Sequence, residues 1–245
     1  MKRELHYFIV SLTFFTRLPV PFFASFEVDD LNKSTKYFTF SGAVIGLCVG
    51  AFYLLLSQFF SLQISVALSM AFSVLLTGAF HEDGFADMCD AFGGGYTHEK
   101  KLEIMKDSRL GTYGTTGLIF IYGLKFLFLT SINYSLFYIF FMAHTLSRLI
   151  PLLIMKYLPY VADKDKSKSK PMATRVRNAY LCVALLPCIF FLLKLPLLYV
   201  PLLFGFGVSY HLFKKHLNGY TGDCLGASQQ MTELSLYLTC VYMFS

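Results

Sequence analysis

Long apolar segments restrict the fold of this 245-residue chain more than any other feature of its sequence. A membrane-crossing helix needs about 20 mostly apolar residues. In lipid, helices satisfy their own backbone hydrogen bonds, so runs of this length predict an all-α, polytopic membrane bundle. We expect seven transmembrane helices, at residues 38–60, 62–81, 110–132, 134–155, 178–194, 196–213 and 223–244.

The N-terminal apolar segment, residues 5–15, is too short to cross a bilayer and is expected to form an interfacial or re-entrant helix. It lacks the cleavage site of a signal peptide. The six cysteines are scattered without a C-x-x-C pair, which favours small buried hydrophobes over disulfides or zinc ligands. No internal repeat divides the sequence, so we expect one integral membrane domain over residues 1–245.

Composition and charge support a membrane protein with a defined orientation. Hydrophobic residues make up 56% of the chain and charged residues 15%, against about 25% charged in soluble domains. Of the 21 Lys and Arg residues, 18 lie before the first span or in alternate connections. Because cytoplasmic loops collect positive charge, the N-terminus and long loops are expected in the cytoplasm and the C-terminus outside. The net charge of +6 therefore reflects topology and phosphate attraction, and no nucleic-acid partner is expected.

An acidic cluster follows the second apolar run, in the segment HEDGFADMCDAFGGG at 81–95. Asp83, Asp87 and Asp90 have helical i, i+4 and i+7 spacing, and Glu82 lies beside them. A solvated helix end is the simplest interpretation. However, carboxylates on one face repel each other unless a cation lies among them, and oxygen ligands favour Mg²⁺ or Mn²⁺. We therefore expect these four residues to bind Mg²⁺ and to handle phosphate or diphosphate.

The ends of this cluster supply further candidates. His81 is a candidate base or hydrogen-bond donor, although a lone histidine here is more often simply interfacial. The triple glycine Gly93, Gly94 and Gly95 allows a sharp bend that would bring backbone N–H groups against a phosphate.

Two later segments contain candidate phosphate-binding residues. Lys106 and Arg109, before the third span, suit either phosphate oxygens or positive-inside anchoring. Asp223 lies near the start of a glycine-rich helix, where it suits an N-cap, an anion site or a second metal.

Charged residues within the expected spans are costly in lipid and must face the bundle interior. Lys125, Glu233 and the pair His144 and Arg148, on one face at i, i+4, are such residues. They predict a polar pocket, and the sequence leaves open whether they bind substrate or one another.

Four segments together give the sequence a specific resemblance. They are FFTRLPVP (14–21), TGAFHEDGFADMCDAFGGG (77–95), EIMKDSRLGTYG (103–114) and GYTGDCLGA (219–227), with Glu233 beyond. In type and order they resemble the membrane cobalamin synthases, or adenosylcobinamide-GDP ribazoletransferases, over nearly the whole chain. Ala91 stands where this family commonly has glycine, and Phe40-Ser41-Gly42 replaces a frequent proline-containing version. Neither change removes a ligand-type residue.

The resemblance implies the last assembly step of the cobalamin nucleotide loop, in a prokaryotic inner membrane with the active site facing the cytoplasm. A ribose hydroxyl of α-ribazole, or of α-ribazole 5′-phosphate, attacks the cobinamide-linked phosphate of adenosylcobinamide-GDP, and GMP leaves with Mg²⁺ required. The oligomeric state stays open, and a homo-oligomer is compatible with the sequence. From the residues and the resemblance together we expect these catalytic residues: His81, Asp90, Lys106 and Arg109. The expected metal ligands are Glu82, Asp83, Asp87 and Asp90, and the expected substrate-binding residues are Gly93, Gly94, Gly95, Lys125, Arg148, Asp223 and Glu233.

Two alternatives use similar residues. A CDP-alcohol phosphotransferase or a prenyltransferase would show a second helix rich in aspartate, where this chain offers only Asp223 and Glu233. A cation-coupled transporter would place its acids near mid-membrane and show an internal repeat.

Overall fold

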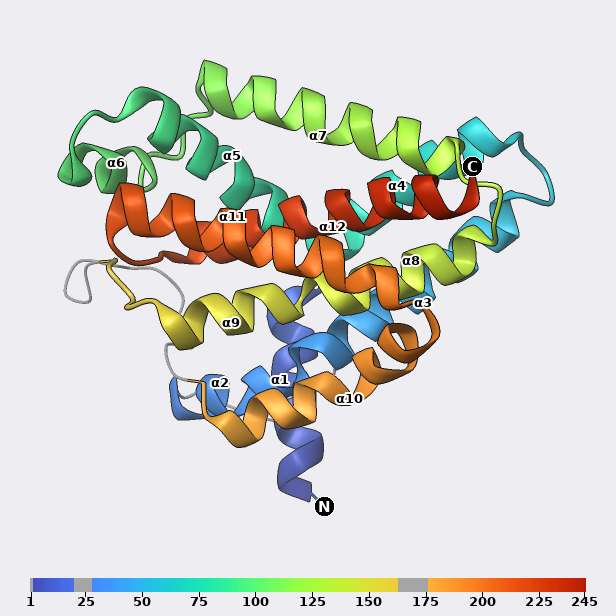
Figure 1. The fold of residues 1–245 in the computed structure, drawn as a ribbon, viewed down its shortest axis with the longest axis horizontal. Helices are drawn as coiled ribbons and strands as arrows, with labels where there is room; N and C mark the ends of the chain where they lie inside the picture. Colours follow the sequence, from blue (N-terminus) through green and yellow to red (C-terminus); the bar gives the residue numbers. More distant parts are fainter. Residues whose placement is uncertain (1, 20–27, 163–175) are drawn as a thin grey trace.

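The computed structural model describes residues 2–19, 28–162 and 176–245, and these residues are helical without any strand (Figure 1). Tyr160 and Tyr220 form an isolated bridge. The helices are α1 (Lys2–Phe15), α2 (Val28–Ser34), η1 (Thr35–Tyr37), α3 (Phe38–Leu56), α4 (Leu62–Thr77), α5 (Phe80–Gly94), α6 (His98–Ile104), α7 (Thr112–Thr130), α8 (Leu136–Ser147), α9 (Leu149–Tyr157), α10 (Asn178–Lys194), η2 (Pro196–Leu198), α11 (Tyr199–Leu217) and α12 (Gly222–Phe244).

The expected all-α membrane bundle is confirmed, whereas the count of seven spans is not. By length and composition, four helical stretches of the described chain suit a membrane span, or five if the bent pair α4–α5 counts as one. Helix α10 is an apolar helix of 17 residues, shorter than these. Helix α12 contains buried polar residues, including Gln229, Gln230 and Glu233, which face the bundle rather than lipid. The four stretches are Asp29–Leu56, Thr112–Thr130, Leu136–Tyr157 and Pro196–Leu217.

A sharp break ends the second apolar run earlier than the sequence predicts. The expected span 62–81 stops at Thr77, and α5 then leaves at 90° to α4. Gly78 and Ala79 both adopt the left-handed conformation, with φ of 67° and 57°. A side chain at Gly78 would also collide with Arg17. The break turns α5, with all its acidic residues, away from the axis of α4.

The connections between the long helices collect at two ends of the bundle (Figure 1). The α5–α7 and α11–α12 connections lie at one end, where a ring nitrogen of His98 is 2.9 Å from the Leu217 carbonyl oxygen. The α3–α4 and α7–α8 connections lie at the other end with the C-terminus, and Asn133 N–H donates to the Phe244 carbonyl. This alternation agrees with the charge pattern. Helix α1 runs across the long helices, and its interfacial location stays a prediction.

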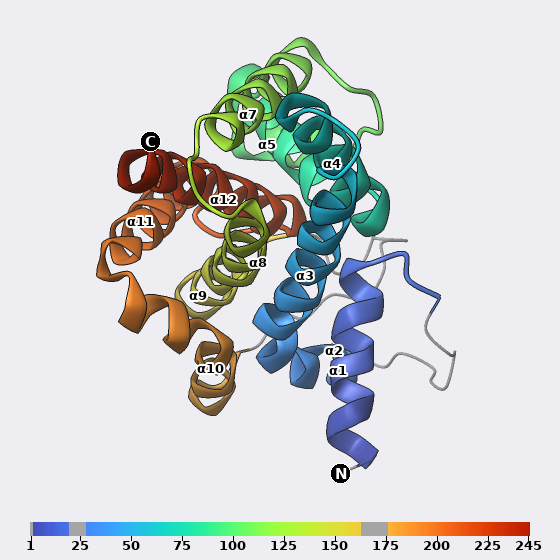
Figure 2. The same cartoon turned by 90° about the vertical axis from the view of Figure 1, so that its right-hand side faces the viewer.

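Helix α12 lies at the centre of the bundle and packs against α5, α7, α8, α9 and α11 (Figure 2). Its first turn contacts α5 at two glycines. A Cβ atom on Gly84 would be 2.8 Å from the Asp223 Cα, and one on Gly226 would be 3.1 Å from the His81 carbonyl oxygen. Small residues allow helix backbones to approach this closely. The last glycine-rich motif of the sequence is thereby held directly against the acidic helix.

Candidate active site

Three carboxylates meet where α5 packs against the start of α12. Asp83 and Asp87 occupy successive turns of α5, the first exposed and the second half-buried. Asp223 is half-buried in the first turn of α12, and its backbone touches Gly84 between the two α5 acids. Asp87 lies within electrostatic range of Asp83, Asp90 and Asp223. We call Asp83, Asp87 and Asp223 the acid face.

In the part of the chain that the structure describes, the ion pairs near the acid face are made by other acids. Lys100 pairs with Glu103, Arg109 with Asp107, and Lys125 with Glu233. Mutually repelling carboxylates are stable together only when solvated or when a cation joins them. The arrangement therefore suits a positively charged ligand.

Asp223 is not the N-cap that one interpretation of the sequence offered. The cap of α12 is Thr221, whose hydroxyl accepts a hydrogen bond from the Cys224 N–H at 3.4 Å. Asp223 lies two residues further, inside the first turn, where the helix dipole stabilises a carboxylate. Its carboxylate oxygens are thus not required for capping.

Asp90 faces away from the acid face and holds the start of α7. Its two carboxylate oxygens accept hydrogen bonds from the N–H groups of Gly111 and Gly114, each with an N···O distance of 2.8 Å. Unpaired N–H groups at a helix start need acceptors, and a carboxylate also complements the helix dipole. The structure thus gives Asp90 a structural role, while its predicted catalytic and metal-binding roles stay predictions.

Glu82 points into the bundle, toward a buried polar cluster. Its Oε1 accepts from Gln230 Nε2 at 3.0 Å, and its Oε2 is buried without a hydrogen-bond partner. Lys125 Nζ donates to Gln230 Oε1 at 2.6 Å and to Glu233 Oε1 at 2.8 Å. Helix α5 therefore contributes Glu82 to a different environment from its neighbour Asp83.

The cluster around Glu233 confirms that the charged residues within the helices face inward. Glu233 also accepts from Gln229 Nε2 at 2.6 Å and from the Tyr237 hydroxyl at 3.2 Å, and His144 Nδ1 lies 3.5 Å away. Lys125, His144 and Glu233 line one small cavity with Glu82. Because a buried ion pair needs its remaining hydrogen bonds satisfied, this cluster fixes how α5, α7, α8 and α12 pack.

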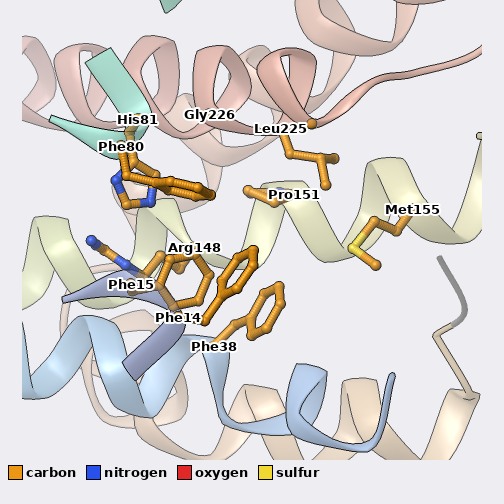
Figure 3. A pocket seen from close by; sticks show the side chains of 11 residues that line it. Phe14, Phe15, Phe38, Phe80, His81, Arg148, Pro151, Met155, Leu225 and Gly226 are labelled. Atoms are coloured by element: carbon orange, nitrogen blue, oxygen red, sulfur yellow. The ribbon is translucent and has the colours of Figure 1, made fainter. Parts of the chain in front are cut away.

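Arg148 lies within electrostatic range of Glu233 and Glu82, and it lines a second cavity together with His81 (Figure 3). Its Nη1 donates to the His144 carbonyl at 2.8 Å, whereas its Nε is buried without a partner. The guanidinium carbon lies 5.7 Å from the ring centre of Phe15. The His81 ring stacks on the same Phe15 ring, with centres 5.4 Å apart.

The remaining predicted phosphate contacts lie on the polar connection before α7. Arg109 is exposed and pairs with Asp107 at 2.5 Å. Hydrogen bonds from Arg109 lower the pKa of Asp107 to about 2, so both groups are charged at neutral pH. Lys106 is exposed nearby.

The triple glycine ends α5 without forming an open cradle. Gly93 and Gly94 are helical, and Gly95 N–H donates to the Ala91 carbonyl at 3.0 Å. Gly93 packs against the ring of Tyr113 and Gly95 against Lys101. A phosphate contact at this segment would have to displace a helical hydrogen bond, and that role stays a prediction.

The donor set of the acid face fits Mg²⁺ in chemistry but does not form a complete cage. Within the described residues, no group of three or more His, Cys, Asp or Glu side chains is arranged to hold a metal ion. Mg²⁺ usually keeps several waters and is bound through one or two carboxylates plus substrate phosphates. Asp83, Asp87 and Asp223 offer carboxylate oxygens from two helices, which satisfies this requirement.

Some residues at these sites were not predicted from the sequence. Gln229 and Gln230 complete the polar cluster, and their positions four and three residues before Glu233 on one helix were a signal for it. The phenylalanines around Arg148 and His81 come from separate helices, so no local pattern indicates them.

Comparisons with known proteins give a consistent result. Residues 7–241 match the family model described as cobalamin-5-phosphate synthase. The chain is 40% identical over 245 residues to the adenosylcobinamide-GDP ribazoletransferase of Vibrio cholerae serotype O1, covering 97% of this chain and 94% of the relative. It is 41% identical over 243 residues to the enzyme of the same name from Vibrio vulnificus, covering 96% and 94%. It is 40% identical over 253 residues to the enzyme of the same name from Leptospira interrogans, covering 97% of this chain and 96% of the relative. No solved structure matches the chain.

Proposed function

Because the chain belongs to the cobalamin-5-phosphate synthase family, we infer that it is a membrane transferase that completes the nucleotide loop of cobalamin. It transfers the cobinamide-phosphate group of adenosylcobinamide-GDP to α-ribazole. A ribose hydroxyl of α-ribazole forms a new P–O bond, the bond to the GMP phosphate breaks, and the hydroxyl proton leaves. The products are adenosylcobalamin and GMP; with α-ribazole 5′-phosphate as acceptor the first product is the 5′-phosphate.

The observation that carries this function is the acid face. Diphosphate substrates bring several negative charges, and they bind to carboxylates only through a shared cation. Two helices that are distant in sequence bring Asp83, Asp87 and Asp223 together by close packing at Gly84. The ion pairs of the described residues nearby are made by other acids.

We propose that one or two carboxylates of the acid face bind Mg²⁺ together with the diphosphate of adenosylcobinamide-GDP. When bound, the ion neutralises phosphate charge and withdraws electrons from the leaving GMP. Glu82 and Asp90 support this arrangement from behind, because each fixes α5 to a neighbour: Glu82 to α12 and Asp90 to α7.

The protein's side chains also position the substrates and accept the proton. Lys106 and Arg109 lie on the exposed connection before α7, where they suit phosphate oxygens of the nucleotide. His81 and Asp223 lie on either side of the α5–α12 contact. The proton of the attacking hydroxyl passes to one of these two side chains.

We further propose that the protein lies in the inner membrane of a prokaryotic cell and that its acid face is on the cytoplasmic side. The support is the charge asymmetry, since 18 of 21 Lys and Arg residues precede the first expected span or lie in alternate connections. The acid face lies toward the end of the bundle that holds the α11–α12 connection (Figure 1).

The test is an assay of GMP release from adenosylcobinamide-GDP, α-ribazole and Mg²⁺ by the purified protein in detergent. We expect GMP and adenosylcobalamin in equal amounts, and no GMP when Mg²⁺ is chelated. Hydrolysis to GMP without a corrinoid nucleotide product, or no reaction at any Mg²⁺ concentration, would refute the proposed function.

Asp223→Asn tests the metal assignment within that assay. We expect a lower rate at low Mg²⁺ and partial recovery at high Mg²⁺, because concentration offsets weaker binding. The matched control is Asp29→Asn, an exposed carboxylate that pairs with Lys33 on α2. An Asp223→Asn variant with the Mg²⁺ dependence of the control would remove Asp223 from the metal site.

A further inference from the structure

The cavity that contains Arg148 and His81 is not explained by phosphate chemistry. It lies among α1, α3, α5, α9 and α12 and is a small cavity that is partly open to the outside. Four phenylalanine rings form much of its wall: Phe14, Phe15, Phe38 and Phe80 (Figure 3). A corrin ring with its side chains is too large for this space.

The rings of the wall pack against one another. Phe15 meets Phe38 edge-to-face with centres 4.6 Å apart, and Phe14 meets Phe80 in the same way at 5.1 Å. The His81 ring stacks nearly parallel to Phe15, at 13° between the planes. Fixed aromatic faces bind a flat ring with little loss of conformational entropy and favour stacking over aliphatic contact.

The cavity provides one strong hydrogen-bond donor that is not in use. Arg148 is only 1% exposed, and its Nε–H is buried without an acceptor. Arg148 and His81 are the polar side chains of the wall, and the remaining wall residues are apolar or glycine. A buried donor without a partner is unfavourable, so an occupant with a single acceptor at this place would be selected. Figure 3 shows the Arg148 guanidinium and the His81 ring on the same side of the cavity.

The cavity adjoins the acid face through the first turn of α12. Gly222 and Gly226 form part of its wall, and Asp223 lies between them in sequence. The backbone of Asp223 touches Gly84, next to Asp83. A group attached to a ring in the cavity therefore reaches the acid face with a short link.

We propose that this cavity binds the dimethylbenzimidazole base of α-ribazole and directs its ribose toward Asp83 and Asp223. The proposal rests on the proposed function and specifies where its acceptor binds. In α-ribazole one ring nitrogen bears the ribose and the other is a free acceptor, which matches the single unused donor, Arg148 Nε–H. The two methyl groups of the base suit the phenylalanine walls.

The guanine of the other substrate fits this cavity poorly. Guanine presents donors at N1 and N2 and acceptors at O6 and N7, and burying them without partners is costly. The wall offers only Arg148 and His81 as polar side chains. The acceptor base and the leaving nucleotide are therefore recognised in different places, the first in the aromatic cavity and the second on the polar side of the acid face.

The first experiment separates the two substrates kinetically. Phe38→Leu and Phe80→Leu keep apolar volume but remove a flat ring from the cavity. We expect each to raise the KM for α-ribazole about tenfold, as for loss of one base–aromatic stack, while the KM for adenosylcobinamide-GDP is unchanged. The control is Phe52→Leu, a ring that stacks on Phe72 at 4.4 Å in the other half of α3, and it should change neither KM.

The second experiment changes the ligand and leaves the protein intact. An acceptor nucleoside with C–H in place of the free ring nitrogen should bind the wild-type protein about tenfold more weakly, because the Arg148 donor stays unpaired. Equilibrium dialysis of the two nucleosides measures this without turnover. This arm stays decisive if a phenylalanine variant fails to fold.

The outcomes distinguish the two proposals. Wild-type protein that turns over its substrates, combined with an unchanged KM for α-ribazole in both cavity variants, refutes this inference and leaves the proposed function standing. A KM increase confined to adenosylcobinamide-GDP assigns the cavity to guanine and also refutes it. Equal affinity for the two nucleosides refutes the Arg148 contact. Wild-type protein that releases no GMP refutes the proposed function instead.

Discussion

The contact between α5 and α12 should control the reaction rate, and Gly84→Ala tests this directly. The added Cβ would lie 2.8 Å from the Cα of Asp223 and 2.9 Å from its carbonyl oxygen. These are backbone atoms, which cannot rotate away as a flexible side chain would. Restoring ordinary contact near 3.4 Å therefore requires α12 to move from α5 by about 0.6 Å, the kind of backbone shift that overpacking forces.

The expected loss follows from this displacement. Misplacing reacting groups by about 1 Å can lower a rate by about a hundredfold, so we expect Gly84→Ala to lower kcat by about tenfold. The fold should survive. Alanine is favoured over glycine in a helix by about 1 kcal/mol, which offsets part of an overpacking cost of about 1–3 kcal/mol.

Gly123→Ala is the matched control, because Gly123 is also helical and, apart from its own helix backbone, no atom of the described residues lies within 4 Å of the position of its Cβ. It gains the same helix preference without a collision, so it should keep the wild-type rate. The assay is the initial rate of GMP release at saturating substrates, with thermal unfolding measured in parallel. Equal rates in the two variants would refute the reasoning that the α5–α12 distance sets the geometry of the acid face.

Three further substitutions separate the roles of neighbouring residues. Asp87→Asn should abolish transfer with little change in thermal stability, whereas Asp90→Asn should destabilise the protein by about 1–2 kcal/mol by weakening the cap of α7; the opposite pattern would exchange their roles. Lys125→Met leaves Glu233 buried without its cation and should cost about 3–5 kcal/mol, seen as a lower unfolding temperature, and an unchanged one would contradict a buried ion pair. In a cysteine-free background, a cysteine replacing Tyr96, which is 97% exposed, and one at the C-terminus should be labelled from opposite sides of the membrane; labelling from the same side would refute the proposed orientation.

The sequence predicted the ends of several helices well, because apolar length and flanking polar residues determine them. The run expected at 178–194 coincides with α10, and the run at 110–132 contains α7. The run expected at 62–81 ended at Thr77 instead, because the left-handed pair Gly78 and Ala79 interrupts a segment whose hydropathy continues. Hydropathy measures the solvent that a segment prefers, and it does not report a backbone turn of two residues.

The candidate site was predicted as a set of residues but not as a geometry. Helical spacing placed Asp83, Asp87 and Asp90 on one face, and the fold then divided that face between two neighbours. Asp90 accepts hydrogen bonds from N–H groups at the start of α7, whereas Asp83 and Asp87 lie where α5 packs against α12. Spacing along one helix cannot say which helix packs against each of its turns. The contribution of Asp223 depended on a contact more than a hundred residues away in sequence, which no local pattern contains.

The first turn of α5 explains why the site lies where it does. Successive residues of an α-helix point about 100° apart, so three neighbours can face three different surroundings. His81 lines the aromatic cavity, Glu82 joins the buried cluster of Lys125 and Glu233, and Asp83 lies on the acid face. The break at Gly78 gives this turn its direction, and the fixed position of Glu82 sets the rotation of the helix about its own axis. A change that rotates α5 would therefore move the aromatic cavity and the acid face together, which couples the two proposed substrate sites to the buried hydrogen bond between Gln230 and Glu82.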